Sequence, residues 1–105
     1  MLIVAGTVRV PAENLDAFRP HMVRMMAASQ AEDGCLDYNY AEDVTHPGLI
    51  RVFERWRDRA ALEAHFLTPH LAAWRAAWPS FGVSDRRLFA YEARADLVRP
   101  WLQPA

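Results

Sequence analysis

The chain has 105 residues, of which 52% are hydrophobic and 24% charged, and its formal net charge is -1. This composition is that of one globular domain and excludes an intrinsically disordered chain. A net charge so close to zero gives no attraction for nucleic acid or for an anionic membrane, so we expect neither as a partner. A domain this small has little room for a deep pocket within one protomer, so we expect a homodimer.

The single cysteine and the N-terminal residues indicate in which cellular compartment the protein is found. Cys35 has no second cysteine with which to form an intrachain disulfide, which suits a reducing environment. Met1 is followed by L-I-V-A without a basic segment, and no apolar run is long enough for a signal peptide or a membrane span. We therefore expect a cytoplasmic protein with one domain over residues 2–93 and a C-terminal tail over residues 94–105.

The first quarter of the chain predicts a strand followed by a helix. Residues 2–10 are rich in β-branched side chains that alternate between two faces, which is typical of a strand. Apolar residues from Leu15 onward follow helical spacing. Asn14 is the expected N-cap of this helix, and Gly34 is the expected first residue after its C-terminal end. Pro20 lies inside this segment and predicts a kink or a later helix start.

A hairpin follows this helix. Residues 35–43 and 49–57 alternate in polarity, and Pro47 and Gly48 mark the turn between them. On the first of these strands we expect one face to carry Leu36, Tyr38 and Tyr40.

The second half of the chain predicts a broken helix and a last strand. Asp58 is the expected cap of a short helix, and Thr68-Pro69 gives the hydroxyl and the proline that typically start a new helix. An apolar stripe continues to Pro79, and residues 88–94 form the final predicted strand.

The predicted order is strand, helix, strand, strand, helix, strand. This order indicates an α+β fold on the ferredoxin-like βαββαβ plan, with an antiparallel sheet and helices on one face.

Glu54 is the first candidate for chemistry. On its strand it shares a face with Val52 and Trp56, so a carboxylate lies on an apolar surface. Buried charges persist mainly when they are paired, and one interpretation is a structural ion pair with Arg51 or Arg75. The alternative is a carboxyl group with a raised pKa beside a ligand.

His65 and His70 are the next candidates. In an unbroken helix a separation of five residues would direct them apart, but the break at Thr68-Pro69 lets both approach one cavity. As an acid or base an imidazole needs little tuning, because its ordinary pKa is close to neutral. The alternative is a structural role for either histidine as a helix cap or a core hydrogen-bonding group.

Known motifs for metals, nucleotides and serine nucleophiles are missing. The sequence holds no H-E-x-x-H, no Cys/His cluster, no G-x-G-x-x-G, no P-loop and no G-x-S-x-G. His46 lies in a separate turn and leaves no evident third ligand beside the two histidines above, so we predict no metal site.

Aromatic residues supply the candidate walls of a pocket for a flat, mostly apolar ligand. Most of their area is expected to be core packing. The candidates that we assign to substrate contact are Trp56, Phe66, Trp74 and Tyr38. Arg51 joins them as a candidate anion-binding group, although acidic residues interleave with its arginine cluster and favour a solvated face.

Five segments carry a family resemblance: V-A-G-T-V-R-V, E-D-G-C-L-D-Y, F-E-R-W-R-D, A-L-E-A-H-F and T-P-H-L. Over residues 2–93 the chain resembles the antibiotic biosynthesis monooxygenase domain, in its small quinol-monooxygenase-like branch. The resemblance implies a dimeric α+β barrel in which each protomer has its own cavity. It also implies oxidation of a quinol, a polyphenol or a polyketide-like aromatic by O₂ without a metal, flavin or other cofactor. The matching positions are Trp56, His65, Phe66 and His70, with His65 as the base or the hydrogen-bond partner of a phenol and Trp56 and Phe66 as walls. Together with Glu54 from the analysis above, His65 and His70 are the candidate catalytic residues.

Two related branches and a non-enzymatic role compete with this interpretation. A haem-degrading branch resembles the chain in fold but uses an Asn where this chain has Gly6-Thr7, and is disfavoured. An isomerase branch acting on a small phosphorylated hydroxyketone, similar to autoinducer-2, shares the A-x-x-x-H and T-P-H segments. A non-catalytic ligand-binding dimer also stays open.

Overall fold

The structure is a computed structural model that describes residues 1–100. Short 3-10 turns lie at Ala12–Asn14 and Ala95–Leu97. The strands and α-helices, in chain order, are β1 (Leu2–Arg9), α1 (Leu15–Gln30), β2 (Cys35–Glu42), β3 (Leu49–Trp56), α2 (Arg59–Phe66), α3 (Pro69–Phe81) and β4 (Ser84–Glu92).

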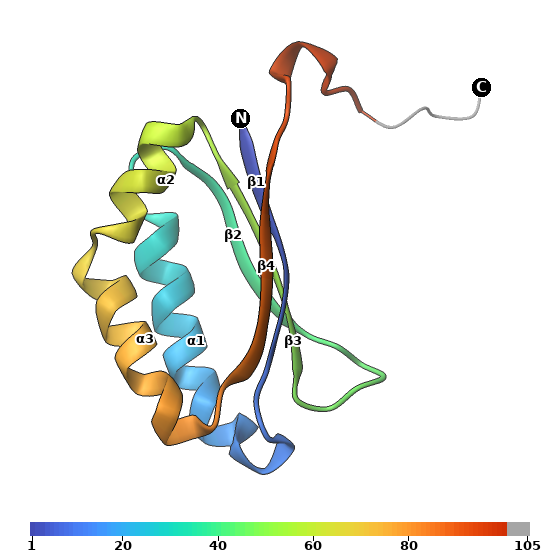
Figure 1. The fold of residues 1–105 in the computed structure, drawn as a ribbon, viewed down its shortest axis with the longest axis vertical. Coiled ribbons are helices and arrows are strands. Elements are labelled where there is room, and N and C mark those ends of the chain that lie inside the picture. The colour runs from blue at the N-terminus through green and yellow to red at the C-terminus, as the bar shows by residue number, and fades with distance from the viewer. Residues whose placement is uncertain (101–105) are drawn as a thin grey trace.

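The strands form one sheet in the order β2-β3-β1-β4, with every neighbouring pair antiparallel. Among the described residues, all three α-helices cover the same face of the sheet, and no α-helix lies on its other face (Figure 1). This confirms the predicted α+β, ferredoxin-like plan. The broken helix of the prediction corresponds to α2 and α3, which run in sequence along the sheet.

Strand alternation builds the core. On the helical side of β1 and β3, the side chains of Val4, Val8 and Ile50 are buried against Phe18 and Met22 of α1. Burial of these apolar side chains is the main stabilising contribution to the fold.

β1 and β4 approach closely at Gly6. A Cβ built at this position would lie 1.8 Å from the carbonyl oxygen of Arg87, so only glycine fits. The register between the two strands shifts between Thr7 and Arg9, next to this contact.

The helix starts at Asp58 and Thr68 are confirmed. The Asp58 side chain accepts a hydrogen bond from the backbone N–H of Ala61, and that of Thr68 from Leu71. These caps satisfy N–H groups that have no partner within the helix. They fix the break that separates α2 from α3.

Three local predictions are wrong in detail. α1 begins at Leu15 as predicted and continues through Pro20, but it ends at Gln30, so Gly34 lies in the following turn and not at the helix end. The Asn14 side chain does not cap α1; its Nδ2 donates to the carbonyl oxygen of Phe81 at 2.8 Å. The last strand starts at Ser84, four positions earlier than residue 88.

The predicted face of β2 is also wrong at one residue. Leu36 is exposed because the pairing of β2 with β3 shifts between Cys35 and Asp37. Such a bulge places an additional residue on one strand and reverses the direction of its side chain. Tyr38 and Tyr40, beyond the bulge, face the core as predicted.

Within residues 1–100, no helix combines the length and apolar character that crossing a bilayer requires. The expected tail over residues 94–105 is described as far as residue 100. Its last five residues lie outside the described part of the chain.

Candidate active site

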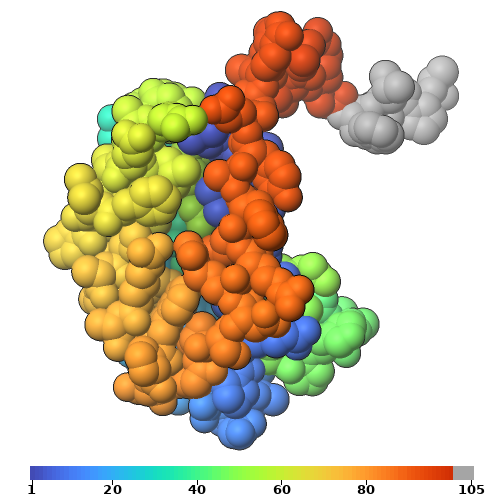
Figure 2. Space-filling view, in the orientation of Figure 1, coloured from blue at the N-terminus to red at the C-terminus, as the bar shows by residue number. Residues whose placement is uncertain are grey.

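A cavity of about 160 Å³ lies between the inner face of the sheet and the helices. The space-filling view shows the hollow between the helical layer and β4 (Figure 2). Most of its wall is apolar, with contributions from Val4, Val8, Met22, Ile50, Val52, Leu62, Phe66, Leu71, Trp74, Trp78 and Leu88. An apolar cavity of about 150 Å³ holds a benzene molecule, so this one has room for an aromatic ring.

Polar side chains interrupt this wall at a few positions. They come from the inner face of the sheet and from the helices α2 and α3, and they are Tyr38, Tyr40, Glu54, His65, Arg75 and Arg86. A mostly apolar cavity with few polar groups is typical of a small-molecule site.

Glu54 lies on the inner face of β3 and is only 5% exposed. Its Oε1 accepts a hydrogen bond of 3.0 Å from the indole Nε1–H of Trp56, and within residues 1–100 it has no ion-pair partner. Burial raises the pKa of Glu54 to about 7, although the Trp56 hydrogen bond and the charge of Arg86 act in the opposite direction. The interpretation of Glu54 as a structural ion pair with Arg51 or Arg75 is therefore wrong. Its carboxyl group instead has a raised pKa and lies on the cavity wall.

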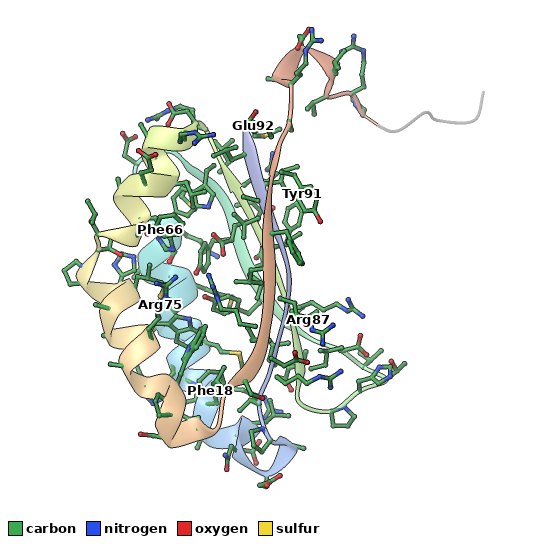
Figure 3. All side chains as sticks on the ribbon, in the orientation of Figure 1. Phe18, Phe66, Arg75, Arg87, Tyr91 and Glu92 are labelled. Atoms are coloured by element: carbon green, nitrogen blue, oxygen red, sulfur yellow. The ribbon has the colours of Figure 1, made fainter. Side chains whose placement is uncertain are left out.

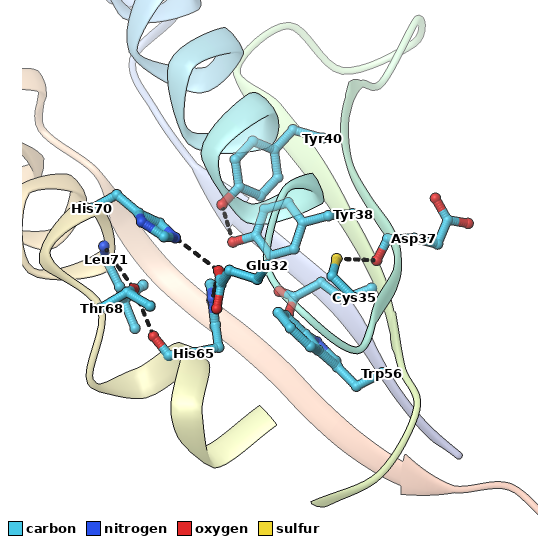
Figure 4. A network of polar contacts seen from close by, with 11 residues as sticks. Glu32, Cys35, Asp37, Tyr38, Tyr40, Trp56, His65, Thr68, His70 and Leu71 are labelled. Carbon is cyan, nitrogen blue, oxygen red and sulfur yellow. Dashed lines mark hydrogen bonds and ion pairs between the residues drawn. The ribbon is translucent and has the colours of Figure 1, made fainter. Parts of the chain in front are cut away.

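His65 and His70 converge on Glu32, a residue that the sequence analysis missed. Glu32 lies in the turn after α1, His65 in the last turn of α2, and His70 in the first turn of α3. The Oε2 atom of Glu32 is 2.6 Å from Nδ1 of His65 and 2.7 Å from Nε2 of His70 (Figure 4). The break between α2 and α3 therefore brings both imidazoles to one carboxylate.

The hydrogen bond to Glu32 sets the tautomer of His65. A carboxylate only accepts hydrogen bonds, so Nδ1 of His65 carries the proton and Nε2 carries the lone pair. Within residues 1–100 no hydrogen bond engages Nε2, and the ring lines the cavity. Burial lowers the pKa of His65 more than Glu32 raises it, so the imidazole is neutral at pH 7.

Aromatic contacts hold the plane of the His65 ring. The Trp56 ring centroid is 4.7 Å away and that of Tyr38 is 5.4 Å away. Tyr38 and Tyr40 share a hydrogen bond of 2.6 Å between their hydroxyls, and burial raises the pKa of both. These two phenols therefore stay protonated at neutral pH and act as hydrogen-bonding groups.

His70 lies outside the main cavity. It lines a separate groove between α1 and α3 together with His21, Arg24 and Trp74. The prediction that both histidines approach one cavity is therefore wrong, because the His70 side chain reaches Glu32 from the outer side of the helical layer.

Of the other residues predicted to contact a substrate, three line the cavity and two do not. Phe66, Trp74 and Tyr38 line it. Trp56 is fully buried and reaches the site only through Glu54 and His65. Arg51 lies on the opposite face of the sheet, where it is paired with Asp43 at 2.9 Å.

Arg75 and Arg86 at the cavity wall were not predicted as ligand-binding residues. Within residues 1–100 neither forms an ion pair with a carboxylate. Arg86 shares the inner face of β4 with Leu88, two positions along the strand, and a predicted strand that began at Ser84 would have shown this.

Among the described residues, one group has the donor atoms for a metal ion. One ligand atom from each of Glu32, His65 and His70 lies within 4.8 Å of the other two. Glu32 supplies the third ligand whose absence was the reason for predicting no metal site, so that reason is wrong.

Comparison with known protein families matches residues 1–77 to the family described as antibiotic biosynthesis monooxygenase. The chain belongs to this family. A crystal structure from Deinococcus radiodurans, described provisionally as an antibiotic biosynthesis monooxygenase, superposes with a TM-score of 0.86 at 31% identity. The match covers 95% of this chain and 99% of that one.

Two curated relatives are similar over part of their length. The protein sll1783 of Synechocystis, which has no assigned function, is 36% identical over 69 residues, or 66% of this chain and 47% of the relative. Rv0793 of Mycobacterium tuberculosis, named provisionally as a monooxygenase, is 38% identical over 60 residues, or 57% of this chain and 58% of the relative. The chain thus spans about half the length of these relatives.

Proposed function

We propose that this protein is a monooxygenase that oxidises a quinol or polyphenol with O₂ and needs no metal or flavin for that step. The observation that carries the proposal is the buried, neutral His65 at an apolar cavity, with Nδ1 hydrogen-bonded to Glu32 and Nε2 free of hydrogen bonds within residues 1–100. An oriented imidazole with a carboxylate on its far nitrogen is the arrangement of a general base.

In the first step His65 removes a phenolic proton. The Nε2 lone pair accepts it, and Glu32 stabilises the resulting imidazolium through the Nδ1–H bond. The apolar cavity withholds water from the phenolate, which therefore stays electron-rich. The phenolate supplies the electrons that reduce O₂.

The reaction balances without another reductant. A quinol and O₂ give a hydroxylated quinone and water. Each product receives one of the two atoms of O₂, and all four electrons that reduce O₂ come from the quinol. The phenolic protons that leave the substrate return in the water. Glu54, whose pKa of about 7 lets it carry a proton at neutral pH, is placed on the wall to hydrogen-bond a substrate oxygen.

The size of the cavity favours a small substrate. About 160 Å³ suits one substituted aromatic ring better than the fused rings of a polyketide. Trp74 lines the cavity, and stacking on Tyr40 and on Phe18, with ring centroids 5.3 and 5.0 Å away, holds its ring in place.

A second candidate is an isomerase of a small phosphorylated hydroxyketone. It is favoured by Arg75 and Arg86, which stand at the cavity without a carboxylate partner among residues 1–100 and suit a phosphate. In the monooxygenase the same arginines would stabilise the phenolate. A protein that binds such ligands without turnover is the third outcome.

We further propose that a second copy of the chain covers the open face of the sheet. Phe53, Phe89 and Tyr91 lie on that face and are 40%, 60% and 55% exposed. Tyr91 and Arg87 are directed away from the helices (Figure 3). A row of exposed aromatic side chains on the uncovered face of a sheet is typical of an interface between protomers.

Oxygen uptake tests the monooxygenase. Protein freed of metal by a chelator and free of flavin is assayed with a panel of quinols and polyphenols. We expect His65→Ala to lower turnover about 10²–10⁴-fold, because general-base catalysis contributes that much. His46→Ala is the matched control, because this imidazole lies on an exposed turn beside Asp43.

Two results would reject the proposal. Turnover that survives in His65→Ala removes the assigned base. Exchange of a substrate C–H with solvent deuterium, without oxygen uptake, selects the isomerase.

A further inference from the structure

We infer that Glu32, His65 and His70 form a binding site for a divalent transition-metal ion of the zinc type. The three side chains come from three separate segments and meet between the cavity and the outer groove, at the turn after α1 (Figure 4). His65 and the Glu32 side chain are largely buried, with exposed fractions of 3% and 13%. Carboxylates that gather by chance on a surface do not show this burial.

The donor set selects the class of ion. Two imidazole nitrogens and one carboxylate oxygen are ligands of Zn²⁺ and its neighbours, whereas Mg²⁺ and Ca²⁺ take oxygen ligands. A fourth position is left for water, because the group offers three protein ligands.

The present distances are close to those of a coordinated ion. Two ligand atoms that are each about 2.1 Å from zinc at the tetrahedral angle lie about 3.4 Å from one another. Oε2 of Glu32 is now 2.6 and 2.7 Å from the two imidazole nitrogens. These two contacts would each need to lengthen by less than about 1 Å. The two imidazole nitrogens, which lie within 4.8 Å of one another, would need to approach by at most about 1.4 Å to reach the same separation. Side-chain rotation supplies movements of this size.

Neighbouring residues hold the two histidine ligands in position, and the site is accessible from the groove between α1 and α3. Trp56 packs on the His65 ring at 4.7 Å, and the Thr68 cap fixes the first turn of α3 that carries His70. His70 is 26% exposed and borders the groove of about 250 Å³ between α1 and α3. An ion and its water can therefore approach through this groove without crossing the substrate cavity.

Metal binding would change His65 at the cavity. The ion takes the lone pair of Nδ1, so the ring proton of the neutral imidazole moves to Nε2. Nε2 can then no longer accept a phenolic proton, and the ion acts as an inhibitor. This consequence rests on the proposed monooxygenase activity, whereas the binding itself does not.

Titration of the chelator-treated 105-residue chain with ZnCl₂ in a calorimeter tests the site, and the visible absorption of Co²⁺ reports the coordination geometry. We expect one ion per chain and no binding of Mg²⁺. Glu32→Gln and His70→Ala should each lower the affinity at least about tenfold, because even the loss of a residue that only hydrogen-bonds to a metal ligand costs this much. His46→Ala, which removes the exposed imidazole beside Asp43, should bind like the wild type.

The outcomes are separable. Circular dichroism first confirms that each variant is folded, and Glu32→Gln serves if His70→Ala is not. Absence of saturable binding, or equal affinity in Glu32→Gln and the wild type, overturns the site. Binding lost in His46→Ala assigns the ion to the hairpin turn and also overturns it. If the protein binds Zn²⁺ but oxidises no quinol, the site stands and only the proposed function fails.

Discussion

The two faces of the sheet give the same type of side chain opposite properties. On the inner face, Glu54 is buried without an ion pair among residues 1–100, and its pKa is raised to about 7. Beside the outer face, Asp43 accepts hydrogen bonds from Thr45 and from Arg51, and its pKa is lowered well below its ordinary value. Burial determines the pKa of the first carboxyl group and hydrogen bonding determines that of the second. The face of the sheet on which an acidic side chain lies therefore decides in which direction its pKa shifts.

The largest expected effect comes from removing the residue that backs the inner face. Trp56→Ala should lower the free energy of unfolding by about 3–5 kcal/mol, because a fully buried ring leaves a cavity. Trp56→Phe retains most of the volume and removes the hydrogen bond to Glu54, so its cost should be smaller. Urea denaturation measures both, and equal costs would show that the hydrogen bond, and not packing, dominates.

The next effect is a pH dependence from Glu54. Its pKa is about 7 in the folded protein and ordinarily 4.5, so between these values the folded state binds more protons than the unfolded chain. The contribution is fully present below pH 4.5 and is lost as the pH rises through 7. We compare the free energy of unfolding of Glu54→Gln with that of the wild type at each pH. Between pH 4 and pH 8 this difference should change in favour of the variant by roughly 3 kcal/mol.

Urea denaturation of both proteins from pH 4 to 8 measures this difference. The titration of His65 is common to wild type and variant and cancels. A stability difference that does not change with pH would mean that the Glu54 carboxyl keeps its ordinary pKa in the folded state.

A charge on the outer face should break the proposed dimer without unfolding the protomer. Phe89→Lys places an ammonium group in the exposed aromatic row, where a partner sheet would have to desolvate it. Sedimentation velocity should give the mass of one chain for this variant and of two for the wild type. Val44→Lys, at a hairpin position that is 97% exposed, is the control. Equal masses for wild type and Phe89→Lys would place any interface elsewhere.

The contrast between the two faces also shows how far the sequence alone could be interpreted. Alternation on β3 correctly placed Glu54 inside, and the Thr68-Pro69 signal correctly placed a helix break between the two histidines. Both features depend on neighbours along the chain. The meeting of Glu32 with His65 does not, because 33 positions separate them and no local pattern marks a turn residue as a ligand.

Errors arose where pairing between strands overrides local pattern. The shift between Cys35 and Asp37 turned Leu36 outward, although strict alternation predicted it to face inward with the tyrosines. The start of β4 was missed because Ser84 and its polar neighbours form a strand only by pairing with β1. Arg86 therefore escaped notice as a cavity residue.

The smallest expected effect has the opposite sign of pH dependence. The pKa of Asp43 is lowered by its hydrogen bonds with Thr45 and Arg51, so its contribution is present above the ordinary value of 3.8 and is lost as the pH falls through the lowered one. Asp43→Asn should therefore destabilise the protein at neutral pH, and this effect should be smaller at pH 3, which lies below the ordinary value of 3.8. High salt should weaken it further, because the Arg51 side chain is 60% exposed. Thermal unfolding at pH 7 and pH 3, with and without 1 M salt, checks this. A difference from wild type that grows as the pH falls would show that Asp43 obeys the same burial control as Glu54.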